Sequence, residues 1–452
     1  MTRTKKGQEV IPSARRLTMS LRDLGYDFVT AVADLVDNSI EAGSSVVNID
    51  VEFNGDNSWV RVADNGKGMR PNELKEAMRY GSEREYDGGD LGKFGLGLKT
   101  ASTSQCRKLS VASRTNKNRS VIVAYCWDVE HVEKINRWEI IPLSGNQLAP
   151  SLREPLDNST GTVVLWEHLD RILGYKFPYG ETARKKLLGM CRDLEQHLAM
   201  VFHRFIIGEV RKRKLKITLN GNDIKPWDPF ARSEPKTKKL PPTILKVQHE
   251  RVRGEVRLEP YVLPNQSDFS SPEAFRRASG PAKWNQQQGF YVYRANRLIQ
   301  SGGWCRLRTS DEHTKLARVA LSFYPVLDDA FKINVAKMRI QLPSQIREQV
   351  EGAIEPVLKL ADSTYRKGNK PGPNLAPIAR VTSNPAASTG LNQDQAIEPG
   401  ATVQMQPLSE ESTEPAMWTL DDIQNRLENI ATLEEKFIIQ RVFTRFRKRL
   451  SA

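Results

Sequence analysis

The chain has little of what marks secreted or membrane-spanning proteins. In 452 residues, no apolar run approaches the roughly 20 residues that a transmembrane helix needs. The N-terminal stretch MTRTKKGQEV also lacks the apolar core of a signal peptide. The sequence therefore predicts a cytoplasmic protein without a membrane-spanning segment.

Cysteine and histidine are scarce, and neither forms a pattern. The four cysteines stand far apart: Cys106, Cys126, Cys191 and Cys305. They show no CxxC or other metal-ligand spacing, which fits a reducing compartment. The six histidines show no ligand spacing either, and we expect packing or surface positions for four of them: His131, His168, His197 and His203.

Positive charge is in excess, with 68 Lys and Arg against 54 Asp and Glu and a net charge of +14. Such an excess favours a polyanionic partner. The basic residues cluster in three stretches: 211–216 (RKRKLK), 235–239 (PKTKK) and 441–449 (RVFTRFRKR). Each is either a solvated face or a nucleic-acid contact. Because no zinc finger or RNA-recognition signature is present, we expect any DNA contact to involve phosphates, independent of sequence.

The stretch 34–41, DLVDNSIE, lies within an apolar helical pattern that spans residues 24–43. Asp34 and Asn38 are four residues apart, so they project from one face of that helix. The amide oxygen of Asn38 suits a hard cation such as Mg²⁺, and the carboxylate of Asp34 could orient a water molecule. The alternative is that both side chains simply face solvent.

Three further motifs follow in order. Residues 60–69, VRVADNGKGM, alternate as a strand and end in an aspartate and a turn with two glycines. Residues 91–102, LGKFGLGLKTAS, form a glycine-rich loop that runs into a predicted helix. Residues 161–165, GTVVL, form another strand that opens on a threonine.

These four motifs resemble, in their order and spacing, the GHKL ATPase superfamily of heat-shock chaperones, MutL repair proteins, type II topoisomerases and microrchidia (MORC) ATPases. The longer sequence around the first motif, SARRLTMSLRDLGYD…ADLVDNSIEAG, most resembles that of bacterial MORC-type members. The resemblance covers residues 13–345. It implies an α+β chain, in which a GHKL (Bergerat) α/β sandwich precedes a transducer domain of the ribosomal-protein βαββ type.

The resemblance also implies an ATP site with magnesium. Asp64 would accept a hydrogen bond from the adenine amino group, with Thr162 in support through a water, and would thereby exclude guanine. Gly66 and Gly68 would let the backbone approach the base, and Met69 would pack on it. The phosphates would bind the backbone of the glycine loop at a helix N-terminus: Gly92, Lys93, Phe94, Gly95, Leu96 and Gly97. Lys99 is either a phosphate contact or a solvated lysine.

One departure concerns the expected general base, which is a glutamate in most hydrolysing members and Asp34 here. The shorter side chain brings the activated water nearer to the helix, so we expect slow ATP hydrolysis. A binding-only switch stays open. Asp37 has a structural or supporting role in this interpretation.

Composition and resemblance divide the chain into six segments: an N-terminal arm (1–20), the ATP-binding domain (21–175), a connecting helix (176–210), the transducer domain (211–365), a flexible linker (366–415) and a basic amphipathic C-terminal helix (416–452). In the first domain we expect strands at 46–53, 59–63, 108–114, 120–127 and 162–167, helices at 24–43, 71–78 and 96–103, and an ATP lid at 81–92. In the second we expect strands near 255–263 and 289–293 and a helix before residue 340.

In the family, a transducer lysine reaches the γ-phosphate, and Lys337 stands at the matching place. Arg339 and Lys332 are rival candidates. The resemblance thus implies a homodimeric, ATP-gated clamp on DNA, in bacterial antiphage defence or DNA maintenance. A heat-shock-type chaperone and a non-hydrolysing switch are the rival functions. The C-terminal helix either docks back on the body or binds a protein partner.

Overall fold

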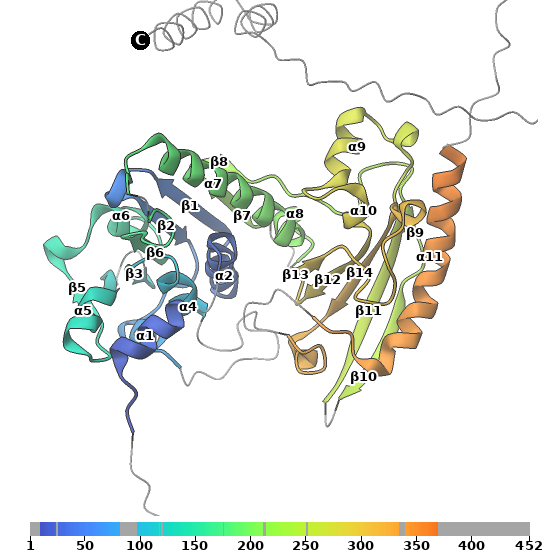
Figure 1. Cartoon of the computed structure of the whole chain (residues 1–452). Helices are drawn as coiled ribbons and strands as arrows, with labels where there is room; N and C mark the ends of the chain where they lie inside the picture. The colour runs from blue at the N-terminus through green and yellow to red at the C-terminus, as the bar shows by residue number, and fades with distance from the viewer. Residues whose placement is uncertain are drawn as a thin grey trace, which may run out of the picture. The chain divides into compact units, whose positions relative to one another are not determined.

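The computed structural model describes residues 10–23, 26–81, 97–116, 118, 121–174, 176–210, 214–249, 252–333 and 340–368. All of them belong to one compact unit, Met1–Asn374. Helices accompany two separate sheets (Figure 1), which confirms the predicted α+β class. Among the described residues, no helix has the length and apolar character to cross a bilayer.

The first sheet has eight strands in the order β5-β4-β3-β6-β2-β1-β7-β8. Its strands are β1 (Val46–Glu52), β2 (Trp59–Asp64), β3 (Lys108–Arg114), β4 (Val123–Asp128), β5 (Ile141–Leu143), β6 (Gly161–Glu167), β7 (Lys216–Leu219) and β8 (Asn222–Asp223). Only the pair β1 and β7 is parallel among these neighbours. The five strands predicted for the first domain are all present, within a few residues of their expected bounds.

In the described part of the first domain, six helices accompany these strands, two before β1 and four between later strands in the sequence. They are α1 (Ala14–Arg22), α2 (Phe28–Glu41), α3 (Pro71–Ala77), α4 (Gly97–Thr103), α5 (Val129–Ile135) and α6 (Pro150–Arg153). Helix α2 begins where the Asp27 side chain accepts a hydrogen bond from the Thr30 N–H, 2.7 Å away. Its apolar residues, such as Phe28 and Leu35, are buried in the main core.

The end of the predicted N-terminal arm is helix α1, which packs on its own chain. Ser13 caps the helix and donates a hydrogen bond to Oδ1 of Asn136, 2.9 Å away. Arg15 Nε donates to the carbonyl oxygen of Glu133, 2.6 Å away. Residues 10–22 are therefore anchored beside helix α5, and residues 1–9 lie outside the described part.

The continuous connecting helix predicted within 176–210 is wrong in two respects. Helix α7 begins only at Glu181, because Pro178 disfavours helical backbone at the residue before it and Gly180 takes an extended conformation. The helix then stops at Val201, and a separate helix α8 runs over His203–Ile207. The break at Phe202 lets both Phe202 and His203 be fully buried.

The second sheet has the order β10-β11-β14-β12-β13, and β9 pairs with β11. Its strands are β9 (Lys238–Lys239), β10 (Thr243–His249), β11 (Val252–Val262), β12 (Gly289–Arg294), β13 (Arg297–Ser301) and β14 (Ala317–Phe323), and its helices are α9 (Pro272–Ser279), α10 (Trp284–Gln287) and α11 (Arg347–Gly368). The helix predicted before residue 340 is wrong for the described residues 317–333, which form β14 and a 3₁₀ turn at Pro325–Leu327.

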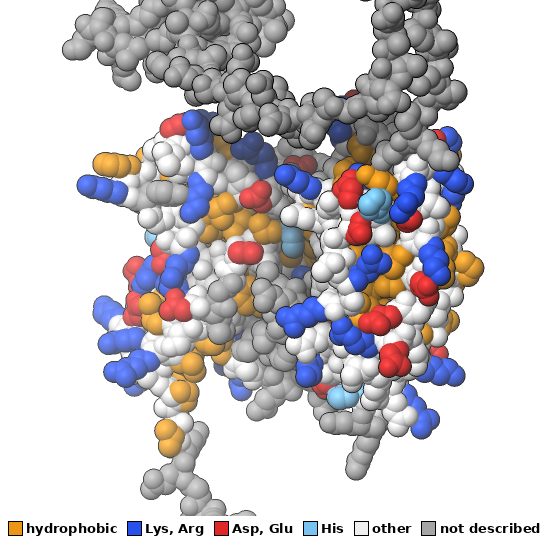
Figure 2. All heavy atoms as spheres, turned by 45° about the vertical axis from the view of Figure 1, so that its right-hand side comes forward, with side chains coloured by type: hydrophobic (Ala, Val, Ile, Leu, Met, Phe, Trp, Pro, Cys, Tyr) orange, Lys and Arg blue, Asp and Glu red, His pale blue; other side chains and the backbone are white. Residues whose placement is uncertain are grey.

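The basic clusters are largely balanced by neighbouring carboxylates where the structure describes them. Lys216 pairs with Asp223 at 3.0 Å, and Lys236 pairs with Asp268 at 2.5 Å. Lys239 lies 3.3 Å from Glu259. On the face shown in Figure 2, basic and acidic side chains are interspersed. Residues 211–213, residues 369–415 of the predicted linker and the predicted C-terminal helix lie outside the described residues, while residues 366–368 form the end of α11 (Arg347–Gly368).

Candidate nucleotide-binding site

Among the polar side chains of helix α2, Asp34, Asp37 and Asn38 lie at different depths. Asp34 and Asp37 are buried among apolar neighbours, with 4% and 1% of their surface exposed. Asn38 is exposed. Buried carboxylates are costly unless charges or hydrogen bonds compensate them, so the surroundings of Asp34 and Asp37 decide what they can do.

Three groups face the carboxylate of Asp34. Its Oδ2 lies 3.5 Å from the position that a Cβ on Gly97 would take, which places the first residue of α4 against it. Its Oδ1 lies 3.9 Å from Nη2 of Arg297. Burial raises the pKa of Tyr26, and the nearby Asp34 carboxylate raises it further. Asp34 therefore lies where the start of α4 meets α2.

Arg297, from strand β13 of the second sheet, makes its closest contacts with Asp37. The Nε atom lies 2.8 Å from Oδ2 and 2.9 Å from Oδ1 of Asp37. Both side chains are almost fully buried, with 3% and 2% exposed. Sequence reasoning missed this pair. The available signal was chemical, since a buried aspartate on an apolar helix needs a cation.

Asp64 ends strand β2 within a group of hydrogen-bond donors. Its carboxylate accepts from the Ser39 hydroxyl at 3.2 Å, the Ser44 hydroxyl at 3.0 Å and the Gly66 N–H at 2.7 Å. Burial raises the pKa of Asp64, while these hydrogen bonds lower it. In the β2–β6 register Asp64 is paired with Thr162, as the adenine assignment requires of neighbours.

Ser113 on β3 connects Thr162 with the glycine turn. Its hydroxyl lies 3.0 Å from that of Thr162 and accepts a hydrogen bond from the Met69 N–H at 2.8 Å. It also donates to the carbonyl oxygen of Gly161 at 2.9 Å. Ser113, which the sequence did not single out, therefore fixes the end of the turn beside Thr162.

Gly66 and Gly68 are required by the packing of the turn itself. A Cβ on Gly66 would lie 2.7 Å from both Ala42 Cβ and Ser44 Oγ. Gly68 has φ of +66°, and a Cβ there would lie 2.2 Å from the carbonyl oxygen of Arg114. The missing side chains let the turn lie against protein atoms.

Lys99 is buried and is not the solvated lysine of one sequence alternative. Its Nζ donates to the carbonyl oxygen of Ala77 at 3.0 Å, and burial lowers its pKa to about 8. The hydroxyls of Tyr80 and Thr103 lie 3.2 Å apart. Both contacts join residues 77–80, which directly precede the predicted lid, to α4.

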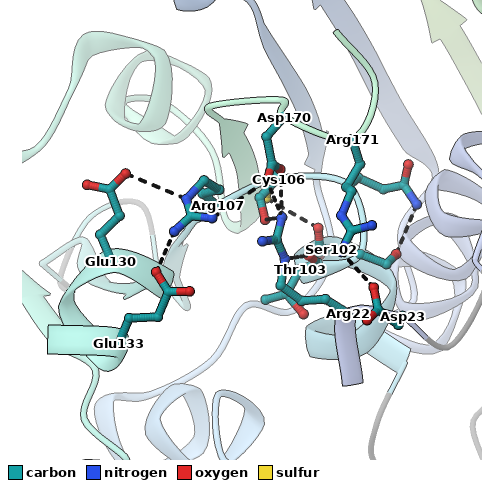
Figure 3. Close-up of polar contacts among 12 residues, drawn as sticks. Arg22, Asp23, Ser102, Thr103, Cys106, Arg107, Glu130, Glu133, Asp170 and Arg171 are labelled. Carbon is teal, nitrogen blue, oxygen red and sulfur yellow. Dashed lines mark hydrogen bonds and ion pairs between the residues drawn. The ribbon is translucent and has the colours of Figure 1, made fainter. Parts of the chain in front are cut away.

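Contacts at the C-terminal end of α4, at Thr103, fix the position of this helix. Figure 3 shows Arg22 directed at Thr103 and Asp170: its Nε donates to the Thr103 carbonyl oxygen at 2.7 Å, and its Nη2 lies 2.6 Å from Asp170 Oδ1. Arg107 pairs with Glu133 at 2.6 Å in the same network. These contacts connect α1, α4 and α5.

Several predicted residues lie outside the described residues: Gly92, Lys93, Phe94, Gly95, Leu96, Lys337 and Arg339. Lys332 is described, and its side chain is exposed. Within the described residues, no group of three or more His, Cys, Asp or Glu could hold a metal ion alone. The single exposed amide of Asn38 fits Mg²⁺, which keeps several waters and phosphate ligands.

A family model described as "Histidine kinase-, DNA gyrase B-, and HSP90-like ATPase" matches residues 26–162. A DNA mismatch repair protein MutL of Haemophilus influenzae (strain PittGG) is 25% identical over 216 residues, which are 47% of this chain and 30% of the relative. A MutL of Shewanella oneidensis is 32% identical over 111 residues, 24% of this chain and 17% of the relative. The chain thus spans less than a third of these relatives.

A solved structure described as "Crystal Structure of N terminal domain of a DNA repair protein" aligns with a TM-score of 0.46 and 15% identity. The alignment covers 78% of this chain and 98% of that one.

Proposed function

Since residues 26–162 form an ATPase domain of the GHKL type with MutL-like homology, we propose that the chain binds ATP with Mg²⁺ and hydrolyses it slowly. The observation that carries this proposal is the convergence of Asp34, Asp64 and the first residue of α4 around one helix, α2. Ser39, next to Asn38, hydrogen-bonds Asp64, so the two ends of the site are connected through this helix.

Asp64 and Thr162 bind the adenine base in this proposal. A carboxylate that already accepts three hydrogen bonds is fixed in direction, and it can accept a further one from an exocyclic amino group. Guanine presents a carbonyl at that position, which Asp64 would repel. Met69 packs on the base.

In this proposal the phosphates bind backbone N–H groups of residues 92–97, of which Gly97, the first residue of α4, is described. Asn38 holds Mg²⁺, which offsets phosphate charge when bound. Lys337 adds a positive charge at the γ-phosphate. Asp34 accepts a proton from the attacking water. The oxygen of that water forms a bond to the γ-phosphorus while the bond between the γ-phosphorus and the leaving ADP oxygen breaks.

We place this activity in a DNA-dependent clamp. The relatives named above are DNA mismatch repair proteins, and the net charge of +14 favours a polyanionic partner. In this proposal ATP brings two copies together around DNA, and hydrolysis releases them. The antiphage role follows from the MORC-type resemblance. The C-terminal helix would bind a protein partner.

A non-hydrolysing switch is the second candidate, favoured by the short side chain of Asp34. ATP turnover of the wild type and of Asp34→Ala, measured with and without duplex DNA, separates the two. We expect turnover that DNA stimulates and that the substitution abolishes. ATP binding without turnover would support the switch. Turnover that is indifferent to DNA would contradict the clamp.

A further inference from the structure

The tip of the β12–β13 hairpin carries two buried arginines. Arg294 and Arg297 pair across the hairpin, and Ala295 and Asn296 between them have φ of +47° and +70°. Arg294 binds Asp328 through Nε at 2.8 Å and Nη2 at 2.7 Å, within the second domain. Arg297 instead binds helix α2 of the ATPase domain. The hairpin tip therefore connects the second sheet to helix α2.

This tip is held firmly from the side of helix α8. Arg204 Nη1 donates to Oδ1 of Asn296 at 3.3 Å and to the Ser322 hydroxyl at 3.1 Å. The Arg204 guanidinium also lies 3.5 Å from the ring centroid of Tyr293. The position of Arg297 thus follows the position of the second sheet.

At its other end, Arg297 faces both carboxylates of α2. Asp37 lies within hydrogen-bond distance, while Asp34 Oδ1 lies at 3.9 Å, which is an electrostatic contact rather than a hydrogen bond. In a buried site a cation at this distance strongly favours one orientation of a carboxylate.

The other titratable groups around Arg297 do not replace its charge. Burial, and to a smaller extent the nearby Arg297, lowers the pKa of His197 on α7 to about 4, so the imidazole is neutral at pH 7. Tyr26 is also neutral there, because its pKa is raised. The negative charge of Asp27, at the start of α2, acts in the opposite direction and raises the pKa of His197.

We propose that Arg297 is a positioning residue for ATP hydrolysis: anchored by Asp37, it orients Asp34 and makes that orientation depend on where the second sheet lies. The inference rests on the proposed role of Asp34 as the base. In this proposal the second sheet contacts the hydrolytic site directly through Arg297.

The test compares Arg297→Gln, Arg297→Lys and the matched control Arg294→Gln in the full-length protein. Arg294→Gln breaks an equally buried ion pair, with Asp328 of the second domain, at the same hairpin tip. We expect Arg297→Gln to lower kcat by about 10- to 100-fold, the usual effect of losing a supporting contact, with KM for ATP changed less than about twofold. Arg297→Lys should recover part of kcat. Arg294→Gln should lower stability and leave kcat nearly unchanged.

A second readout does not depend on turnover. Hydrogen exchange of β13 amides is followed with and without Mg²⁺ and AMP-PNP. We expect the nucleotide to slow exchange in β13 of the wild type and of Arg294→Gln, and to lose this effect in Arg297→Gln. A wild type that binds no nucleotide would refute the proposed function. Binding with the same β13 response in wild type and Arg297→Gln, or equal losses of kcat in both arginine variants, would overturn this inference.

Discussion

The hydroxyl of Ser39 on helix α2 lies 3.2 Å from Oδ2 of Asp64 at the end of strand β2. Because Ser39 follows Asn38 directly, this hydrogen bond ties the adenine end of the proposed site to its metal end. Different side chains form the two ends, Asp64 at one and Asn38 at the other, so substitutions there should have separable effects on base selectivity and on magnesium dependence.

Asp64→Asn should weaken ATP binding by about 1–3 kcal/mol, the cost of a mispaired buried polar group. The amide keeps the size of the side chain but places a donor where a carboxylate oxygen would face the adenine amino group. Isothermal titration with ATP checks this. Asp50→Asn, which changes a carboxylate paired with Arg61 elsewhere in the sheet, is the matched control. Equal affinities of wild type and Asp64→Asn would remove Asp64 from the site.

Asn38→Ala should abolish the magnesium dependence of nucleotide binding while leaving stability within about 0.5 kcal/mol, because the side chain is exposed. Titrations of both proteins with ATP, in Mg²⁺ and in EDTA, check it. An undiminished effect of Mg²⁺ in the variant would show that the ion is held elsewhere.

Lys99→Met should change how stability depends on alkaline pH. The folded pKa of Lys99 is about 8, below the ordinary 10.5, so between these values the unfolded chain binds more protons. The wild type should therefore gain up to about 3 kcal/mol relative to the variant as pH rises through this window. Urea unfolding of both proteins between pH 7.5 and 10 measures the difference. If the free energies of unfolding of the two proteins change in parallel with pH, the pKa of Lys99 is not lowered in the folded protein.

His203→Gln should make the protein less sensitive to acid. Burial lowers the pKa of His203 to about 3, and its Nε2 lies 2.8 Å from the Tyr293 hydroxyl. As pH falls below 6.5, His203 becomes protonated in the unfolded chain but stays neutral in the folded chain. The free energy of unfolding of the wild type therefore falls by about 1.4 kcal/mol per pH unit through this group. Glutamine keeps a polar partner for Tyr293 without titrating. Urea unfolding from pH 7 to 5 should show the shallower slope in the variant, and an unchanged slope would contradict the assignment.

Local pattern predicted most of the first sheet. The alternation in residues 59–63 corresponds to β2, in which buried and half-buried residues partly alternate. The expected strands at 108–114 and 162–167 correspond to β3 and β6, which are buried over nearly their whole length. The break at Phe202 was missed, since the apolar stripe continues through it. There, the burial of His203 against Tyr293 overrides helical periodicity.

Long-range partners were out of reach of pattern reasoning. Arg297 is 260 residues from Asp37, and nothing in the spacing of either residue indicates the other. Lys99 likewise gave two alternatives, and only its contact with the Ala77 carbonyl distinguishes a buried lysine from a solvated one. The contacts of the Ser39, Ser44 and Ser113 hydroxyls could not be predicted either, because nothing in the local sequence around a serine indicates its distant hydrogen-bond partner.

The most direct test of the account is a titration of the wild-type protein with ATP and with GTP, each in Mg²⁺ and in EDTA. We predict saturable, magnesium-dependent binding of ATP and binding of GTP that is weaker by at least about tenfold, since a mispaired buried group costs about 1–3 kcal/mol. Absence of ATP binding, or equal binding of both nucleotides regardless of magnesium, would contradict it.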